Sequence, residues 1–295
     1  MLVEVRARNM VITDANDARV VRRYIEARKR RVVGPVSSLW RKQRELVTVT
    51  AAKHALRTGA LPSDLEDAWN EMLVEFVRDD LVPEWIKSIS AAGSGIAKKV
   101  NRIQRKQFDF SPAAQSTMSW IDSASGTLIA NFSASQINAV RALLHEQVSQ
   151  GVASPYLLAQ RIRPIVGLTE KEAGYVRKVM TSLVEEGLPA KIVNGQVERL
   201  ANTLHRNRAF RIARTELSDA YNFGQLDSVK QAARAGWLPG VPQKSWIAGG
   251  PNPCEVCEEN EAAGPIPLED TFPSGDERPT AHPSCACSCS FEVRR

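Results

Sequence analysis

The placement of the cysteines constrains the C-terminal part of this 295-residue chain more than any other feature. All five cysteines lie between residues 254 and 289: four form a Cys-x-x-Cys motif followed by a His-x-x-Cys-x-Cys motif, and Cys289 follows two residues later. A Cys-x-x-Cys turn places two thiolates on one side of a tight loop, and a His/Cys pair would complete the tetrahedral site that Zn²⁺ favours. The sequence therefore predicts a structural zinc site. Its candidate ligands are Cys254, Cys257, His282, Cys285 and Cys287.

Disulfides and buried free thiols are the two alternatives for these cysteines. An odd number leaves one cysteine without a partner, and Cys285 and Cys287 are too close in sequence to pair within a strand. In an extended segment, side chains alternate between faces, so Cys285, Cys287 and Cys289 would join Phe291 and Val293 in a core. Both alternatives stay open, as does the choice between Cys285 and Cys287 as the fourth ligand.

The sequence predicts no catalytic site. Zinc deaminases combine Pro-Cys-x-x-Cys with an upstream His-x-Glu, and zinc proteases use His-Glu-x-x-His. The upstream histidines, His54, His145 and His205, stand in neither context. A zinc ion with four protein ligands has no open position, so we expect it to stabilise the fold. We expect neither catalytic residues nor a small-molecule substrate.

The composition predicts a soluble protein that is assembled in a reducing cytoplasm and does not enter a membrane. Residues 1–13 contain Glu4, Arg6 and Arg8, which interrupt any apolar core of a signal peptide. No stretch approaches the roughly 18 apolar residues that a membrane span needs. A reducing compartment also favours a metal site over disulfides.

Charge is segregated along the chain. Residues 19–44 carry ten basic groups against one acidic group, residues 64–84 carry eight acidic groups against one basic group, and residues 87–106 are basic again. Two antiparallel helices would neutralise each other in this pattern, or the basic segments would bind phosphates. No RNP motif, classical zinc finger or leucine zipper accompanies the charge. Any contact with double-stranded DNA is therefore expected to be independent of sequence.

Helical periodicity dominates the chain as far as Gly236. Capping boxes at 63–66 and 169–172 each precede a stripe of apolar residues at helical spacing. Ser154-Pro155 predicts a helix start, and Gly187 with Pro189 predicts a helix end. The expected stripes are Leu65, Trp69, Met72 and Phe76; Ile137, Val140, Leu144 and Val148; and Ala173, Val176, Met180 and Leu183. A further helix is expected at about 194–235. Pro83 should kink or end the helix that begins with the capping box at 63–66.

We therefore expect a mainly α protein: an elongated helical body with a small, zinc-stabilised, β-containing C-terminal module, α+β overall. Three regions are expected: a charged helical region at 1–130, a helical body at 131–236 and a Pro/Gly-rich module at 237–295. Short strands are expected at 244–247 and 289–293. A module of under 60 residues is too small to rely on an apolar core, and a metal would supply the missing stability.

Glu216 lies in the apolar stripe of the last long helix, three and four residues after Ala213 and Ile212. A carboxylate in that position needs a partner. We expect it to accept hydrogen bonds from an arginine or from backbone N–H groups of the metal module, and a catalytic acid is the alternative. The small residues Ala220 and Gly224 would let another element approach this helix closely.

These motifs together resemble the phage Mu protein F-like family of minor head (head morphogenesis) proteins, over residues 130–295. The residues that carry the resemblance are Ile212-Ala-Arg-Thr-Glu216, Ala220, Asn222-Phe-Gly224, Trp246, Cys254-x-x-Cys257, Ile266-Pro-Leu and His282-Pro-Ser-Cys285-Ala-Cys287. The chain departs from the family pattern at Ala286, where an arginine is usual, and adds Cys289. These departures leave the fourth metal ligand open.

The resemblance implies a structural virion component that is not an enzyme. Such proteins join the procapsid with the portal protein or the major capsid protein, assist head assembly and, in some members, touch the packaged DNA. The implied location is the virion, in the head interior or at the portal vertex, after assembly in the host cytoplasm. The alternative is a zinc-stabilised nucleic-acid-processing enzyme or a toxin-related protein, because similar motifs occur in such proteins.

Overall fold

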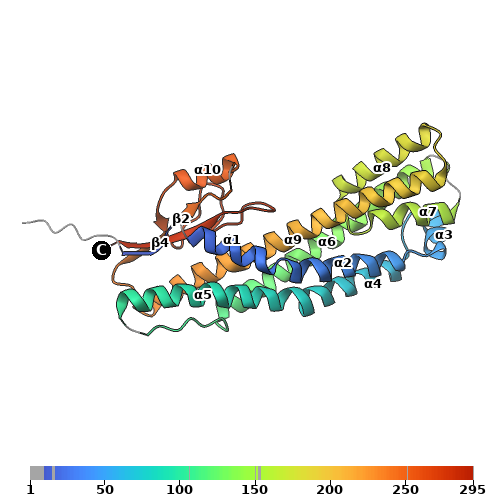
Figure 1. Cartoon of the computed structure of the whole chain (residues 1–295). Coiled ribbons are helices and arrows are strands. Elements are labelled where there is room, and N and C mark those ends of the chain that lie inside the picture. Colours follow the sequence, from blue (N-terminus) through green and yellow to red (C-terminus); the bar gives the residue numbers. More distant parts are fainter. Residues whose placement is uncertain are drawn as a thin grey trace, which may run out of the picture. The chain divides into compact units, whose positions relative to one another are not determined.

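The computed structural model describes residues 10–14, 17–105, 107–149, 151, 154–250 and 252–294. The chain is mainly helical with one small antiparallel sheet, as predicted (Figure 1). The α-helices are α1 (Asp17–Arg28), α2 (Arg30–Glu45), α3 (Val49–Thr58), α4 (Ser63–Phe76), α5 (Val82–Gln104), α6 (Gln115–Ser149), α7 (Pro155–Ile162), α8 (Glu170–Glu185), α9 (Ala190–Arg234) and α10 (Glu255–Ala262). A π-helix, η1 (Val77–Leu81), precedes α5, and a 3-10 turn, η2 (Arg163–Ile165), follows α7.

The chain divides into two compact units that do not follow the expected sequence regions. Unit 1 contains residues 1–31, 82–122 and 211–295, and unit 2 contains residues 32–81 and 123–210. Both α6 and α9 contribute a segment to each unit. Among the helices that the structure describes, none has both the length and the apolar character needed to span a bilayer.

Unit 2 has an all-helical core. Its buried apolar side chains come from α3, α4, α6, α7, α8 and α9 and include Trp69, Leu144 and Leu158. Gly167 follows η2 with φ of 84°, and a Cβ there would lie 2.4 Å from the Trp40 ring. Glycine is therefore required where the η2 turn meets α2.

The helix ends of unit 2 follow the local sequence signals in most places. Thr169 and Glu172 form the predicted capping box, and the Ser154 side chain accepts a hydrogen bond from the Leu157 N–H. The box predicted at 63–66 is wrong, because Pro62 is the N-cap of α4 and no side chain caps it. Pro62 has the extended conformation that an N-cap needs (φ −58°, ψ 137°), so Ser63 is already helical. Leu73, not Met72, is the buried residue of the α4 stripe.

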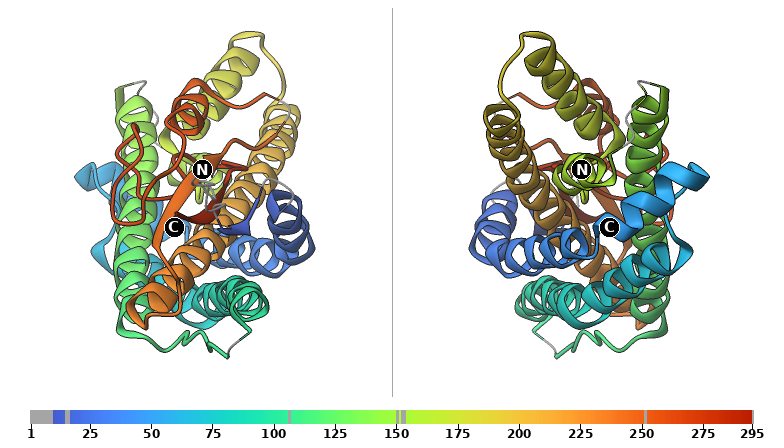
Figure 2. Two further views of the ribbon diagram at one scale, coloured as in Figure 1. Left: turned by 90° about the vertical axis from the view of Figure 1, so that its left-hand side faces the viewer. Right: turned by 90° about the vertical axis from the view of Figure 1, so that its right-hand side faces the viewer.

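The sheet of unit 1 joins the N-terminal and C-terminal parts of the chain. Its strands are β1 (Met10–Thr13), β2 (Val241–Ile247), β3 (Ile266–Pro267) and β4 (Ser288–Arg294), in the order β1-β4-β2-β3. β2 and β4 contain the two predicted strands, whereas β1 and β3 were not predicted. Figure 2 shows the strands beside the last part of α9, where Leu226 and Val229 share a buried cluster with Phe291 and Val293.

Close packing of α5 against α9 explains the small residues of α9. A Cβ at Gly224 would lie 2.5 Å from the Ile89 carbonyl oxygen, so only glycine allows this approach. We expect Gly224→Ala to destabilise unit 1 by about 1–3 kcal/mol, because the two backbones must move apart. Gly126→Ala in α6 is the matched control: no atom lies within 4 Å of its Cβ position, and alanine should stabilise the helix by up to about 1 kcal/mol. Urea unfolding measures both, and equal effects would contradict the packing argument.

Candidate metal centre

The Cys-x-x-Cys motif lies at the start of α10. Cys254 is the N-cap residue with φ −80° and ψ 160°, and its carbonyl accepts the Glu258 N–H at 3.0 Å. Cys257 follows in the first helical turn and is buried. The start of the helix therefore places both sulfurs on one side.

The His-x-x-Cys motif is a tight turn. The Cys285 N–H donates to the His282 carbonyl at 3.1 Å, Pro283 occupies the second position and Ser284 has φ of 64°. Proline at the second position and positive φ at the third are typical of a type II turn. The turn brings the His282 and Cys285 side chains to the same place.

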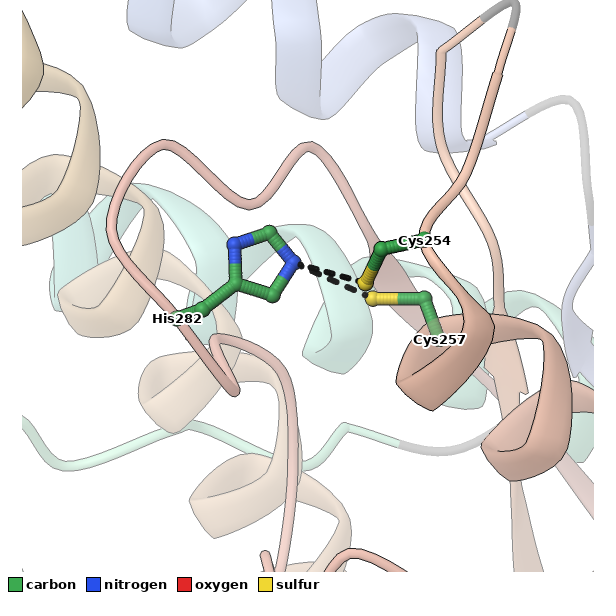
Figure 3. A group of neighbouring side chains, drawn as sticks. All are labelled: Cys254, Cys257 and His282. Atoms are coloured by element: carbon green, nitrogen blue, oxygen red, sulfur yellow. Dashed lines mark hydrogen bonds between the residues drawn. The ribbon is translucent and has the colours of Figure 1, made fainter.

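The two motifs meet with the spacing of a four-coordinate metal site (Figure 3). The His282 Nε2 atom lies 3.2 Å from the Cys254 sulfur and 3.4 Å from the Cys257 sulfur, and the Cys257 and Cys285 sulfurs are 3.8 Å apart. Ligands at the usual Zn–S and Zn–N distances would be separated by about 3.8 Å for two sulfurs and about 3.6 Å for sulfur and nitrogen. The observed distances come close to these values, so the cluster could hold a metal.

The orientation of His282 supports this assignment. Its Nδ1 atom lies 3.1 Å from the Pro283 carbonyl oxygen, which can accept only from a protonated nitrogen. The Nε2 atom, which faces the two sulfurs, then carries the lone pair (Figure 3). A histidine held by a carbonyl at its distal nitrogen is the usual arrangement of a metal ligand.

Cys287 has a different set of contacts. The Gly249 N–H donates to its sulfur at 3.3 Å, and a Cβ at Gly249 would lie 1.9 Å from the Ala286 carbonyl oxygen. Contact with Cys285, opposed by burial but aided by the Gly249 N–H, lowers the pKa of Cys287 to about 6. Cys287 is therefore the sulfur whose surroundings most favour the thiolate form.

The five candidate ligands form two groups that share Cys257. Cys254, Cys257 and His282 lie within 4.8 Å of one another, and so do Cys257, Cys285 and Cys287. Burial raises the pKa of the Cys257 thiol to about 12. A coordinated cation reverses that effect, because coordination deprotonates a thiol.

The structure also answers the two alternatives for the cysteines. All five are free thiols, so no disulfide joins them. Cys289 is buried beside Phe291 and Val293, as the alternative of core thiols predicts, whereas Cys285 and Cys287 belong to a separate cluster with Cys257 and Trp246. The strand β4 begins at Ser288, so Cys285 and Cys287 precede the strand and Cys289 lies within it.

Three polar contacts fix the cluster to α9. The Arg278 guanidinium donates to the Asp219 carboxylate at 2.8 Å, the Ser284 N–H donates to the Thr215 hydroxyl at 2.9 Å, and the Asn222 amide donates to the Cys287 carbonyl at 3.3 Å. Thr215 and Asn222 lie in the α9 motif, whereas Asp219 is not part of the quoted motif and Arg278 is a single arginine in an acidic loop.

The expectation that Glu216 fixes the tail to α9 is wrong, because Asp219, one turn later, has that role. Among the described residues, no arginine pairs with Glu216, and its side chain is partly buried. Burial and the neighbouring Asp219 carboxylate raise the pKa of Glu216 to about 8. Glu216 is therefore largely protonated at neutral pH, which is why it needs no cationic partner.

The raised pKa predicts a pH-dependent effect of Glu216→Gln. The folded protein binds this proton more tightly than the unfolded chain, so Glu216 reduces the free energy of unfolding as pH rises from about 4.5 to about 8. Glutamine does not titrate. We expect the variant to match the parent protein at pH 5 and to exceed its stability by on the order of 2 kcal/mol at pH 9. Urea unfolding at both pH values measures the difference, and the same difference at pH 5 and pH 9 would exclude titration of Glu216 as the cause.

Comparison with known proteins gave no relative: no protein-family model, no curated protein and no solved structure matches this chain.

Proposed function

We propose that this chain is a structural minor head protein of a tailed bacteriophage, associated with portal or capsid protein during procapsid assembly. The observation that carries the proposal is the contact between the α9 motif and the cysteine motifs, the two sets of residues on which the family resemblance rests. The α9 motif ends at Gly224, 30 positions before Cys254, and Thr215, Asp219 and Asn222 of α9 contact the turn and loop that carry the cysteines. The α9 motif and the cysteine motifs are expected to occur together in one family if both are needed to build the same structural element.

We also propose that the cluster binds one structural Zn²⁺ per chain. Three ligands are Cys254, Cys257 and His282, and the fourth is Cys285 or Cys287. The sulfur and nitrogen donors suit Zn²⁺, and a site with four protein ligands supplies folding energy rather than catalysis. Elemental analysis of protein purified under reducing conditions should give one zinc per chain. Protein that is folded and free of metal would contradict the zinc proposal.

The functional proposal has its own test. Mass spectrometry should find the chain in procapsids of the phage or prophage that encodes it, and the portal protein of the same genome should co-purify with it. The Cys257→Ser variant should lose this association, whereas Cys289→Ala should retain it. Absence from procapsids, together with a DNA-cleaving activity that Cys257→Ser abolishes, would instead favour the enzyme alternative.

A DNA contact is part of this proposal, and the structure selects the residues that test it. Arg28 pairs with Glu84 at 2.6 Å, so part of the basic segment is neutralised within unit 1. Among the described residues, Arg19, Arg23, Arg30 and Arg31 are exposed and take part in no ion pair.

Replacement of Arg19, Arg23, Arg30 and Arg31 by glutamate should weaken binding to duplex DNA equally for unrelated sequences. It should also flatten the salt dependence by about one unit of log–log slope per lost phosphate contact. Fluorescence anisotropy between 50 and 200 mM salt measures the slope. Binding that is independent of salt, or unchanged in the variant, would show that these arginines serve protein contacts.

A further inference from the structure

Unit 2 contains a pocket that the proposed function does not use. The pocket has a volume of about 360 Å³ and is bounded by α7, η2, α8 and α9. This volume lies in the range of small-ligand sites. Its lining includes Arg161, Arg163, Met180, Asn194, Gly195 and Glu198.

The two arginines of the pocket are not neutralised by the protein. Arg161 donates through Nη1 to the Gln147 side-chain carbonyl, and Arg163 donates through Nε to the Val47 carbonyl at 3.0 Å. Both acceptors are uncharged. Within the described ranges, no carboxylate forms an ion pair with either guanidinium, and the nearby Glu146 pairs with Arg177 at 3.6 Å. Burial lowers the pKa of Arg161, and the Glu146 carboxylate acts in the opposite direction.

The rest of the lining is arranged as a preformed site. The Asn194 amide donates to the Gln160 side-chain oxygen at 3.1 Å, which fixes the orientation of both amides at the pocket wall. Gly195 lies inside α9, where glycine is unfavourable relative to alanine. Packing does not require it, because the nearest atom to a Cβ at Gly195 is the Arg199 Nη1 atom, 4.0 Å away. A side chain at residue 195 would therefore take up pocket space.

We propose that this pocket binds a single carboxylate group. Arg161 and Arg163 contribute two positive charges, and the acidic residue of the lining, Glu198, pairs with Arg44 at 3.8 Å, so the pocket favours an anion. The buried Met180 side chain suits the aliphatic carbons that carry a carboxylate, which a phosphate ion lacks. A guanidinium binds a carboxylate through two parallel hydrogen bonds. The carboxylate belongs either to an acidic side chain of a protein partner or to a small organic acid.

Calorimetric titration of the full chain separates these cases. The probes are acetate, inorganic phosphate and a short peptide with blocked ends and one glutamate. A carboxylate probe should saturate one site per chain, and Arg161→Gln and Arg163→Gln should each weaken its binding by about tenfold or more. Arg141→Gln, at an exposed arginine of α6 outside the pocket, is the matched control and should bind as the parent chain does. Gly195→Leu keeps both arginines but fills the pocket, so it should abolish binding in a chain of unchanged helicity.

Tighter binding of the peptide than of acetate would assign the carboxylate to a protein partner, and equal binding would assign it to a small acid. Phosphate binding as tight as that of either carboxylate would overturn the proposal, as would carboxylate binding that survives the arginine variants or Gly195→Leu. Failure of all three probes to bind would also overturn it. The result is independent of the head-protein proposal, because it requires no phage component.

Discussion

Cys257→Ser should release the metal and unfold the sheet and the cysteine loops of unit 1, while the helices of unit 2 stay folded. Cys257 is the one residue common to both groups of candidate ligands. A structural zinc site supplies an apparent binding free energy of about 10–16 kcal/mol, which equals or exceeds the stability of a typical domain. Loss of the near-ultraviolet circular dichroism of buried Trp246, together with rapid proteolysis after residue 236, would report the unfolding. A zinc chelator should produce the same change in the parent protein.

The matched control is Cys289→Ala. Cys289 is as deeply buried as Cys257, but its sulfur lies among Phe291, Val293 and other apolar side chains of the sheet. Its loss should leave the zinc content unchanged and cost about 1 kcal/mol, as for a small apolar truncation. Equal damage from both substitutions would mean that the cysteines act as core side chains, and the metal site would then be unsupported.

Arg278→Ala should destabilise the attachment of the cysteine loops to α9 by about 3 kcal/mol. This value is at the lower end for a broken buried ion pair, because 30% of the Asp219 side chain is exposed. The substitution also removes the contacts of the guanidinium with the Phe223 and Trp120 rings, at 5.4 and 5.9 Å. Burial already raises the pKa of Asp219, and loss of Arg278 raises it further. The destabilisation should therefore increase as the pH rises.

A double-mutant cycle with Asp219→Asn separates the ion pair from the ring contacts. Removal of both charges leaves no uncompensated carboxylate, so Arg278→Met combined with Asp219→Asn should cost less than the sum of the two single changes. Hydrogen exchange of residues 237–294 measures the attachment locally. Additive effects would show that Arg278 acts through the aromatic rings alone.

Local signals in the sequence predicted α4, α7 and α8 and parts of α6 and α9. The Thr169–Glu172 box, the Ser154-Pro155 start and the Gly187 end depend on contacts within one helical turn, so a short stretch of residues determines them. The start of α6 at Gln115, well before the predicted region near residue 133, could not be predicted in this way. Its first turns contain four serines and a glycine, which have low helix propensity. Packing within unit 1 buries Thr117 and Ile121 of this segment.

The candidate metal cluster was also predictable, because its ligands come from two short motifs with fixed internal spacing. The contacts that support the cluster were not. Arg278 and Asp219 are 59 positions apart, and only the folded chain shows that Asp219 rather than Glu216 receives the arginine. Glu216 was misjudged because a buried carboxylate was assumed to be ionised. Protonation is the other way to bury such a group.

The pairing of β1 with β4 affects how the protein can fold during its synthesis. Met10 lies opposite Val293, so β1 cannot join the sheet until residues as far as Val293 have left the ribosome. β1 must remain unpaired during that time, and pairing over such a distance along the chain is slow. The helices of unit 2, made from residues 32–81 and 123–210, can pack earlier. The nascent protein therefore exposes strand edges until β4 has been synthesised, and before that point it is most exposed to aggregation and most dependent on chaperones.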